Sequence, residues 1–199
     1  MDMNAPVGLS GQLALARRLE TIANNVANAG TVGYKSEAVT FATVVSKTQP
    51  FNTSFVFDGG PHVDVSGGGF KKTGNPLDVA VRGNGFLAIG TPLGTAYTRD
   101  GRLQMLPTGD IVTLEGHPVL DAGGAPLTVD PDGGPPDISN DGVVRQNGRT
   151  LGSLGLFDLD LGKGYSRYEN SAFVPSSTPA PIDDFTRDGI VQGFTEDSN

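Results

Sequence analysis

The chain has 199 residues, including 29 Gly and 14 Pro, so it is long enough to bury a core but offers few places for long helices. A net charge of -8, with no basic run longer than two residues, argues against nucleic acid as a partner. Because Cys is absent, disulfides, thiolate metal sites and Cys nucleophiles are excluded. We expect neither membrane insertion nor a Sec signal, because no apolar run is long enough and the first residues are not basic.

One stretch, LSGQLALARRLETIANNVANAGTVGYK, predicts a long helix. Ser10 is a suitable N-cap, the firm part runs from Gln12 to about Ala27, and Gly30 and Gly33 end it. Its larger apolar side chains follow each other at steps of four, three and four and fall in one row: Leu15, Leu19, Ile22 and Val26. This row, which we call the seam, has coiled-coil spacing. No second long helix is expected in the chain, so the seam predicts a partner.

Three amides crowd the end of this helix at Asn24, Asn25 and Asn28. They indicate either a fraying C-terminus, where Asn is tolerated, or polar contacts that fix the register of a helix interface. After them, Gly33 is expected to permit the turn out of the helix, with Tyr34 packing behind it.

The segment from Ser36 to Phe70 has no helical period and predicts short extended pieces joined by loops. Its apolar residues include Val39, Phe51 and Phe55, and Asp58-Gly59-Gly60-Pro61 is expected to form a turn.

From Asn75 to Val129, short apolar runs alternate with Gly turns, which is typical of an antiparallel β-rich module. Leu77–Val81 and Phe86–Ile89 are expected to form a hairpin through Asn84-Gly85. The remaining predicted strands are 95–98, 102–105, 111–114, 126–129, 143–145, 151–161, 172–174 and 190–194, with a turn expected at Asn147-Gly148. The fold class is therefore mainly β, with an N-terminal coiled-coil-forming helix. We expect a helix and turn at 1–35, an extended linker or β segment at 36–75 and a β-rich globular domain at 76–199.

Two blocks of the chain carry a family resemblance. LETIANNVANAGTVGYKSEAVTF resembles the N-terminal signature of the flagellar rod and hook proteins, at Ala23, Asn24, Asn25, Ala27, Asn28, Thr31, Gly33, Tyr34 and Lys35. NPLDVAVRGNGFLAI and AYTRDGRLQMLPTGDIVTLEGHPVL resemble the central motifs of that family, in the same order. The short stretch between Lys35 and Asn75 and the ending 193–199 are most similar to the proximal-rod members.

The resemblance implies a structural subunit of the flagellar rod, in the basal body, exported through the flagellum's own secretion apparatus. Its implied partners are other axial proteins and copies of itself. The closing GIVQGFTEDSN resembles the end of the family's globular part, after which members carry a C-terminal helix, so the chain is expected to be a fragment. The assembly surface would comprise the seam, the three Asn residues, Gly33 and Tyr34.

No catalytic or cofactor motif stands out in the sequence. His62 and His117 lie beside Pro in turn-rich segments, Asp130-Pro131-Asp132-Gly133 does not fit a calcium loop, and Gly83-Asn84-Gly85 does not fit a dinucleotide fingerprint. We therefore expect no enzyme, cofactor, metal or small-molecule substrate. Two alternatives stay open: an autonomous β-rich binding module of adhesin or carbohydrate-binding type, whose helix packs on its own sheet, and a hydrolase with an unfamiliar site.

Overall fold

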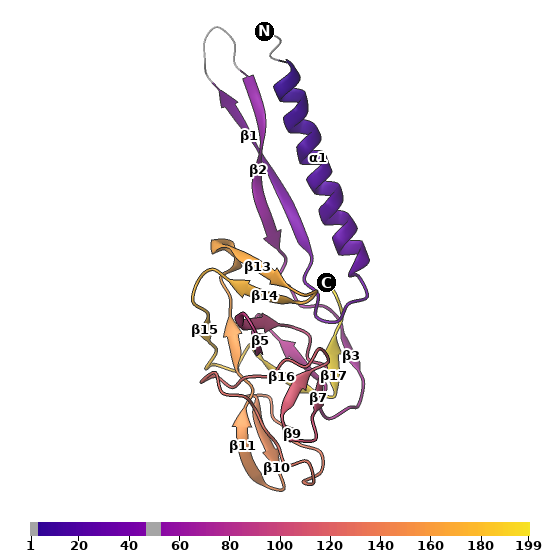
Figure 1. Ribbon diagram of the computed structural model, residues 1–199, viewed down its shortest axis with the longest axis vertical. Helices are drawn as coiled ribbons and strands as arrows, with labels where there is room; N and C mark the ends of the chain where they lie inside the picture. The colour runs from indigo at the N-terminus through magenta and orange to yellow at the C-terminus, as the bar shows by residue number, and fades with distance from the viewer. Residues whose placement is uncertain (1–3, 47–52) are drawn as a thin grey trace. The chain divides into compact units, whose positions relative to one another are not determined.

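The structure is a computed structural model that describes residues 4–46 and 53–199 (Figure 1). Two compact units form: a helical unit, which joins Met1–Ala29 to Ser36–Asp64, and a β-rich unit, which joins Gly30–Lys35 to Val65–Asn199. Residues 30–35, here called the exit turn, directly follow the helix in sequence but belong to the β-rich unit. The predicted division into 1–35, 36–75 and 76–199 stays a prediction.

The helical unit contains α1 (Asn4–Ala27) and an antiparallel hairpin of β1 (Glu37–Ser46) and β2 (Thr53–Val63). The helix begins earlier than the predicted start near Gly11, and Pro6 lies in its first turn, where a missing N–H is tolerated. It ends at Ala27, as predicted, and Asn28 N–H donates to the carbonyls of Asn24 and Asn25. No helix within the described residues is long and apolar enough to cross a membrane.

The predicted extended conformation after the helix is confirmed, but the expectation of short pieces joined by loops was wrong, because β1 and β2 pair over their whole length, with Glu37 opposite Val63 and Ser46 opposite Thr53. The expected turn at Asp58–Pro61 lies inside β2. Between Val39 and Phe41 of β1 the register shifts, which leaves β2 with one extra residue in this stretch, where Gly60 has φ +86°. Phe51 lies outside the described residues.

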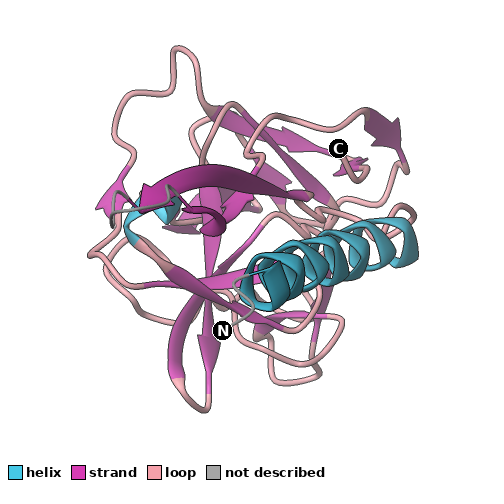
Figure 2. Cartoon of the chain, turned by 90° about the horizontal axis from the view of Figure 1, so that it is seen from above, coloured by secondary structure: helices cyan, strands magenta, loops and turns pink. Residues whose placement is uncertain are grey.

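The β-rich unit consists of short strands and loops, with one turn of 3₁₀ helix at Leu161–Lys163 (Figure 2). Its strands are β3 (Phe70–Lys72), β4 (Val79–Arg82), β5 (Phe86–Thr91), β6 (Gly94–Thr98), β7 (Leu103–Met105), β8 (Ile111–Thr113), β9 (Asp137–Ile138), β10 (Val143–Gln146), β11 (Arg149–Ser153), β12 (Leu156–Asp158), β13 (Tyr165–Tyr168), β14 (Ala172–Pro175), β15 (Ala180–Pro181), β16 (Gly189–Gln192) and β17 (Phe194–Glu196).

All strand pairs in these sheets are antiparallel. The largest sheet has six strands in the order β13-β14-β6-β5-β12-β15, and a second has the order β11-β10-β9. Three further pairs are β16 with β4, β17 with β3, and β7 with β8. The prediction of a mainly β fold with one N-terminal helix is confirmed.

The expected hairpin through Asn84-Gly85 was wrong. Strand β4 pairs with β16, whereas β5 pairs with β6 and β12, so the chain passes from one sheet to another at this turn. Gly83 adopts φ +86°, and Asn84 N–H donates to Asp188 Oδ1 (2.7 Å), which directs the turn toward the segment before β16.

Two predicted strands are divided in the structure. The run 151–161 becomes β11, β12 and the 3₁₀ turn, and 190–194 is broken at Gly193, whose φ is +79°. That break moves the chain from β4, the partner of β16, to β3, the partner of β17. The run 126–129 forms only isolated bridges. By contrast, Asn147 (φ +52°) and Gly148 (φ +75°) form the left-handed turn expected from an Asn-Gly hairpin between β10 and β11.

The core of the β-rich unit is a single cluster of buried aliphatic side chains from most of its strands. Its members are Val79, Val81, Leu87, Ile89, Ala96, Leu103, Ile111, Val119, Leu127, Val129, Ile138, Val144, Leu154, Leu156, Ala172 and Ile190. Phe86 and Phe173 are also buried and meet edge to face, 5.9 Å apart between ring centroids. No member of the aliphatic cluster comes from the exit turn.

Candidate assembly surface and exit turn

The seam is exposed along its whole length. Leu15, Leu19, Ile22 and Val26 keep 62%, 67%, 48% and 70% of their surface accessible, although they are the larger apolar residues of one helical row. Side chains of this kind are normally buried, so a contiguous exposed row indicates a contact surface.

Another face of α1 covers the hairpin. The less exposed positions of the described helix recur at helical spacing and carry small or polar residues: Ser10, Gly11, Ala14, Thr21 and Asn25. Small side chains allow close approach between the helix and β1 and β2, which both contact it. Sequence reasoning missed this face because a period of small and polar residues carries no hydrophobic signal.

The three Asn residues differ in their environments. Asn25 Nδ2 donates to Glu37 O (2.8 Å), and Glu37 N–H donates to Asn25 Oδ1 (3.1 Å), so one amide satisfies both backbone groups at the start of β1. Asn28 Nδ2 donates to Asn24 O (2.9 Å) at the end of the helix. Asn24 is exposed. The structure thus gives Asn25 a role inside the chain, while a register contact with another subunit stays a prediction.

Position 33 requires glycine for two reasons: its backbone conformation is left-handed, and there is no room for a side chain. Its φ is +69°, and a Cβ there would overlap backbone atoms of Arg99 and Asp100. Its N–H donates to Glu196 O (2.8 Å), which joins the exit turn to β17.

Tyr34 is buried beside Gly33, with only 3% of its surface exposed. The Arg167 guanidinium lies 4.6 Å from the Tyr34 ring centroid and 4.8 Å from that of Phe173, and it donates to Lys35 O (2.5 Å). Gly33 and Tyr34 were both predicted to belong to the assembly surface. Their burial supports the narrower expectation that they form and hold the turn.

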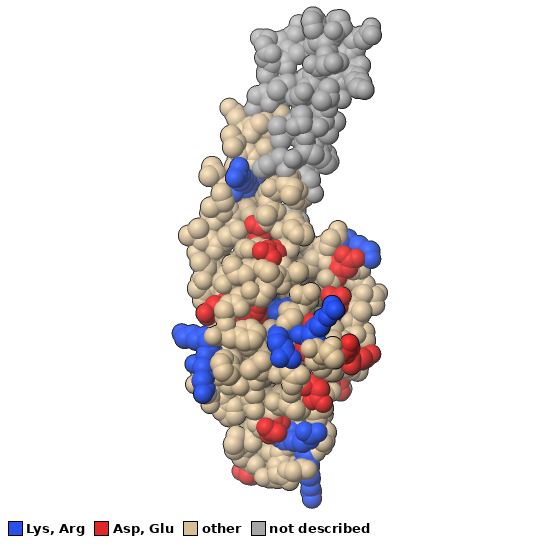
Figure 3. Space-filling view, turned by 180° about the vertical axis from the view of Figure 1, so that it is seen from behind, with Lys and Arg blue, Asp and Glu red and all other residues tan. Residues whose placement is uncertain are grey.

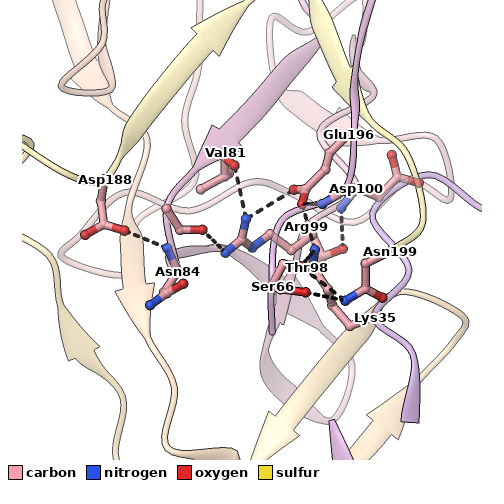
Figure 4. Close-up of polar contacts among 12 residues, drawn as sticks. Lys35, Ser66, Val81, Asn84, Thr98, Arg99, Asp100, Asp188, Glu196 and Asn199 are labelled. Carbon is pink, nitrogen blue, oxygen red and sulfur yellow. Dashed lines mark hydrogen bonds and ion pairs between the residues drawn. The ribbon is translucent and has the colours of Figure 1, made fainter. Parts of the chain in front are cut away.

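Three charged side chains meet in the interior, next to this turn (Figure 4). Lys35 Nζ lies 2.6 Å from Glu196 Oε1, and Arg99 Nη1 lies 3.1 Å from Glu196 Oε2. All three side chains are fully buried. We call Lys35, Arg99 and Glu196 the ion cluster.

Backbone carbonyl and N–H groups also form hydrogen bonds with the ion cluster. Lys35 Nζ also donates to Ser66 O (2.7 Å), and Gly68 N–H donates to Glu196 Oε1 (2.9 Å). Arg99 donates to Val81 O (3.0 Å) and Gly83 O (2.5 Å). Removing one partner of such a buried ion pair typically destabilises a protein by about 3–5 kcal/mol, because the other charge is left uncompensated.

Burial lowers the pKa of Arg99, and the charge and hydrogen bond of Glu196, together with the charge of Asp188, oppose that shift. Within the described residues, Arg99 Nε is buried and has no hydrogen-bond partner. Sequence reasoning did not single out Arg99 or Glu196, because charged residues in polar segments are normally exposed. All three residues do lie in segments that carry the family resemblance: Lys35 in the N-terminal signature, Arg99 in AYTRDGRLQMLPTGDIVTLEGHPVL and Glu196 in GIVQGFTEDSN.

The residues considered for chemistry make local contacts or lie exposed. His117 Nε2 lies 3.0 Å from Glu169 Oε1 and 3.4 Å from Tyr168 Oη, whereas His62 is exposed. Asp130 Oδ1 accepts the N–H of Asp132 in a local turn. The part of the chain that the structure describes contains no group of three His, Asp or Glu side chains placed to bind a metal ion.

A polar hollow of about 370 Å³ in the β-rich unit is lined in part by Asp100, Arg102 and Glu169. Arg102 forms an ion pair with Asp100, whose hydrogen bond raises the pKa of the guanidinium, and Glu169 pairs with His117. These charged groups of the lining thus have partners within the chain.

Two family models match the chain. Residues 7–35 match the flagella basal body rod protein family, and residues 80–146 match the flagellar hook protein FlgE/F/G D1 domain. The first match covers most of α1 and ends at Lys35, in the ion cluster.

Relatives match the chain over nearly its whole length. It is 49% identical to the flagellar basal-body rod protein FlgF of Mesorhizobium japonicum, over 97% of this chain and 80% of that protein. It is 42% identical to FlgF of Rhizobium meliloti, over 100% of this chain and 83% of that protein. It is 31% identical to the flagellar basal-body rod protein FlgG of Bacillus subtilis, over 96% of this chain and 83% of that protein. The chain therefore belongs to the flagellar rod and hook protein family, as an FlgF-like structural subunit of the basal-body rod that assembles with other axial proteins.

Proposed function

We propose that α1 assembles the rod by burying its seam against helices of neighbouring axial subunits, both related proteins and copies of this chain. The exposed seam carries this proposal. Burial of four such side chains would stabilise an interface by roughly 1.5–3 kcal/mol each, before the entropic cost of association. Heterologous contacts repeated at a fixed rotation then generate an open helical assembly, which is the form of a rod.

We further propose that the subunit belongs to the proximal part of the rod and leaves the cytoplasm through the flagellar secretion apparatus, without a Sec signal. The family resemblance supports both points. We also propose that it works without catalysis, nucleic acid or a small-molecule substrate. On the face in Figure 3, basic and acidic side chains are interspersed, which offers no extended basic surface for a polyanion.

The alternative of an autonomous binding module predicted that the helix would pack on its own sheet. The helix does cover the hairpin, but through its small and polar face, and the seam stays exposed. No feature of the structure favours the adhesin or carbohydrate-binding alternative.

The test is Leu19→Asp, which places a charge in the seam. We expect assembly with axial proteins to be lost in a pelleting assay, because a buried unpaired charge is strongly unfavourable. Circular dichroism should show the β-rich unit folded, since Leu19 is outside it.

Leu13→Asp is a matched control. Leu13 is also exposed, at 57%, but lies about 160° around the helix from Leu15. We expect this variant to assemble. Normal assembly of Leu19→Asp, or equal loss in both variants, would contradict the assignment of the interface to the seam.

A further inference from the structure

We propose that a groove between α1 and β1 receives Leu19 of a second copy of this chain, and that Glu20 of that copy pairs with Arg18 at the rim. This inference rests on the proposed function, because the exposed seam supplies the inserted side chain. It adds the place on the neighbouring copy where the seam docks.

The groove lies within the helical unit, beside the seam. It has a volume of about 360 Å³ and is lined by Arg18, Thr21, Ile22, Glu37, Ala38 and Val39. Ile22 belongs to both the seam and the groove, and at 48% it is the least exposed of the four seam residues. The seam and the groove therefore form one continuous surface.

The strand side of the groove is held in place by Asn25. The Asn25 amide donates to Glu37 O and accepts from Glu37 N–H, and β1 pairs with β2 from Glu37 onward. Ala38 and Val39 follow on this fixed strand. A groove formed in this way loses little conformational entropy when it is filled.

The seam alone is too small for a stable interface. Specific protein interfaces commonly bury about 800 Å² on each partner and involve roughly 20–30 residues a side. Four side chains in one helical row supply only part of that area. A contact that extends from the seam into the groove includes the strand as well as the helix, and so comes closer to the usual size.

The helix carries both charges that the rim contact needs. The charged residues of α1 are Arg17, Arg18 and Glu20. Within the part of the chain that the structure describes, neither Arg18 nor Glu20 forms an ion pair. Glu20 directly follows Leu19, whose side chain is 67% exposed, so a copy that inserts Leu19 brings a carboxylate to the rim.

A contact of this kind can repeat from copy to copy. Each chain offers its Leu19 to one neighbour and its groove to another, which makes the contact heterologous. Heterologous contacts that do not close into a ring generate an open helical assembly, as a rod requires. This favours a second copy as the occupant.

Cross-linking tests the docking site, because the chain has no Cys of its own. Full chains with Ala38→Cys are mixed with differently tagged chains with Leu19→Cys, assembled with axial proteins and treated with a short bismaleimide. The matched control replaces Ala38→Cys by Ala23→Cys, an exposed position about 140° around the helix from Arg18. We expect about ten-fold more mixed dimer with Ala38→Cys than with the control, because docked thiols react at a high effective concentration.

A pelleting assay on the same samples separates this inference from the proposed function. Pelleted assemblies without the mixed dimer, or with equal amounts from Ala38→Cys and Ala23→Cys, would overturn the docking site and leave burial of the seam standing. The groove would then belong to a different occupant or to none. Normal assembly of Leu19→Asp, measured without the cross-linker, would instead overturn the proposed function.

Charge reversal is a second test that leaves Leu19 and Ala38 unchanged. Arg18→Glu and Glu20→Arg should each lower the assembled yield about three-fold at low salt, because like charges would meet at the rim. The double variant restores the pair in every copy, since both residues come from the same chain, and should recover the original yield. A further loss in the double variant, or no loss in either single variant, would overturn the rim contact.

Discussion

The two units of this protein differ in which side chains they bury and which they leave exposed. In the helical unit, α1 leaves Leu19 and Val26 about two-thirds exposed and presents small and polar residues to its own hairpin. In the β-rich unit, Leu87 and Phe173 are fully buried, and so are the charges of Lys35, Arg99 and Glu196. The β-rich unit thus buries its apolar core within one chain, whereas the seam of the helix stays exposed.

The comparison also separates two kinds of signature residue. The seam residues are exposed, so a neighbour can bury them, whereas Gly33, Tyr34 and Lys35 are buried inside the β-rich unit. This continuous stretch of sequence therefore leaves large apolar side chains exposed in its helical part and buries its last three residues within the β-rich unit.

The two units should differ most in how much free energy of unfolding is lost when a Leu side chain is truncated to Ala. Leu87→Ala should lower the free energy of unfolding of the β-rich unit by about 2–5 kcal/mol, because a cavity forms in a packed core. Leu19→Ala should change that stability by less than about 0.5 kcal/mol. Urea unfolding followed by tyrosine fluorescence measures both, and similar losses would remove the distinction between the units.

Gly33→Ala should be the next most damaging change. The new Cβ would overlap the backbone of Arg99 and Asp100 at a left-handed φ, so we expect a loss of about 1–3 kcal/mol. Gly30→Ala is the matched control, because nothing lies within 4 Å of a Cβ at that position. Thermal unfolding of the two variants gives the comparison, and equal midpoints would show that the exit turn is not tightly held.

Asn25→Ala should weaken the helical unit by about 1–2 kcal/mol, since both backbone groups of Glu37 lose their side-chain partner. The readout is amide exchange at Glu37 and along the start of β1. Asn24→Ala, on an exposed position of the same helix, should leave that exchange unchanged. Equal acceleration in the two variants would mean that helix propensity, rather than the amide contact, controls this region.

The smallest effect concerns pH. The hydrogen bond from Ser139 Oγ, followed by that from Val143 N–H, lowers the pKa of Asp141 below its ordinary value of 3.8. The folded-state pKa is depressed, so this contribution to stability is present above pH 3.8 and is lost as the pH falls through the folded-state value. Acid titration of Asp141→Asn should show a shallower loss of stability below pH 3.8, and Ser139→Ala should do the same more weakly.

The sequence predicted the parts of the fold that local chemistry determines. The helix end at Ala27 follows from the Gly and Asn residues after it, and the Asn147-Gly148 hairpin follows from the left-handed turn that this pair favours. The pairing of β4 with β16 was missed, because it depends on segments more than a hundred residues apart. The Asn84-Gly85 pair predicted that β4 would form a hairpin with β5, but β4 pairs with β16.

The candidate site was predicted in part. Helical periodicity identified the seam, and the structure leaves those residues exposed. It could not identify the ion cluster, because burial of Lys35, Arg99 and Glu196 becomes favourable only when all three meet in one place. The hairpin-facing side of α1 was missed for a related reason, since Ala14, Thr21 and Asn25 have no apolar pattern.

The distance in sequence between Lys35 and Glu196 has a consequence for the order in which the chain folds. A ribosome finishes the helix and its following turn long before it adds the acid that secures them, and closing a loop of 161 residues is entropically slow. Attachment of the exit turn to β17 must therefore wait for the synthesis of Glu196, so a nascent chain would carry α1 ahead of an unsecured exit turn until that residue is added.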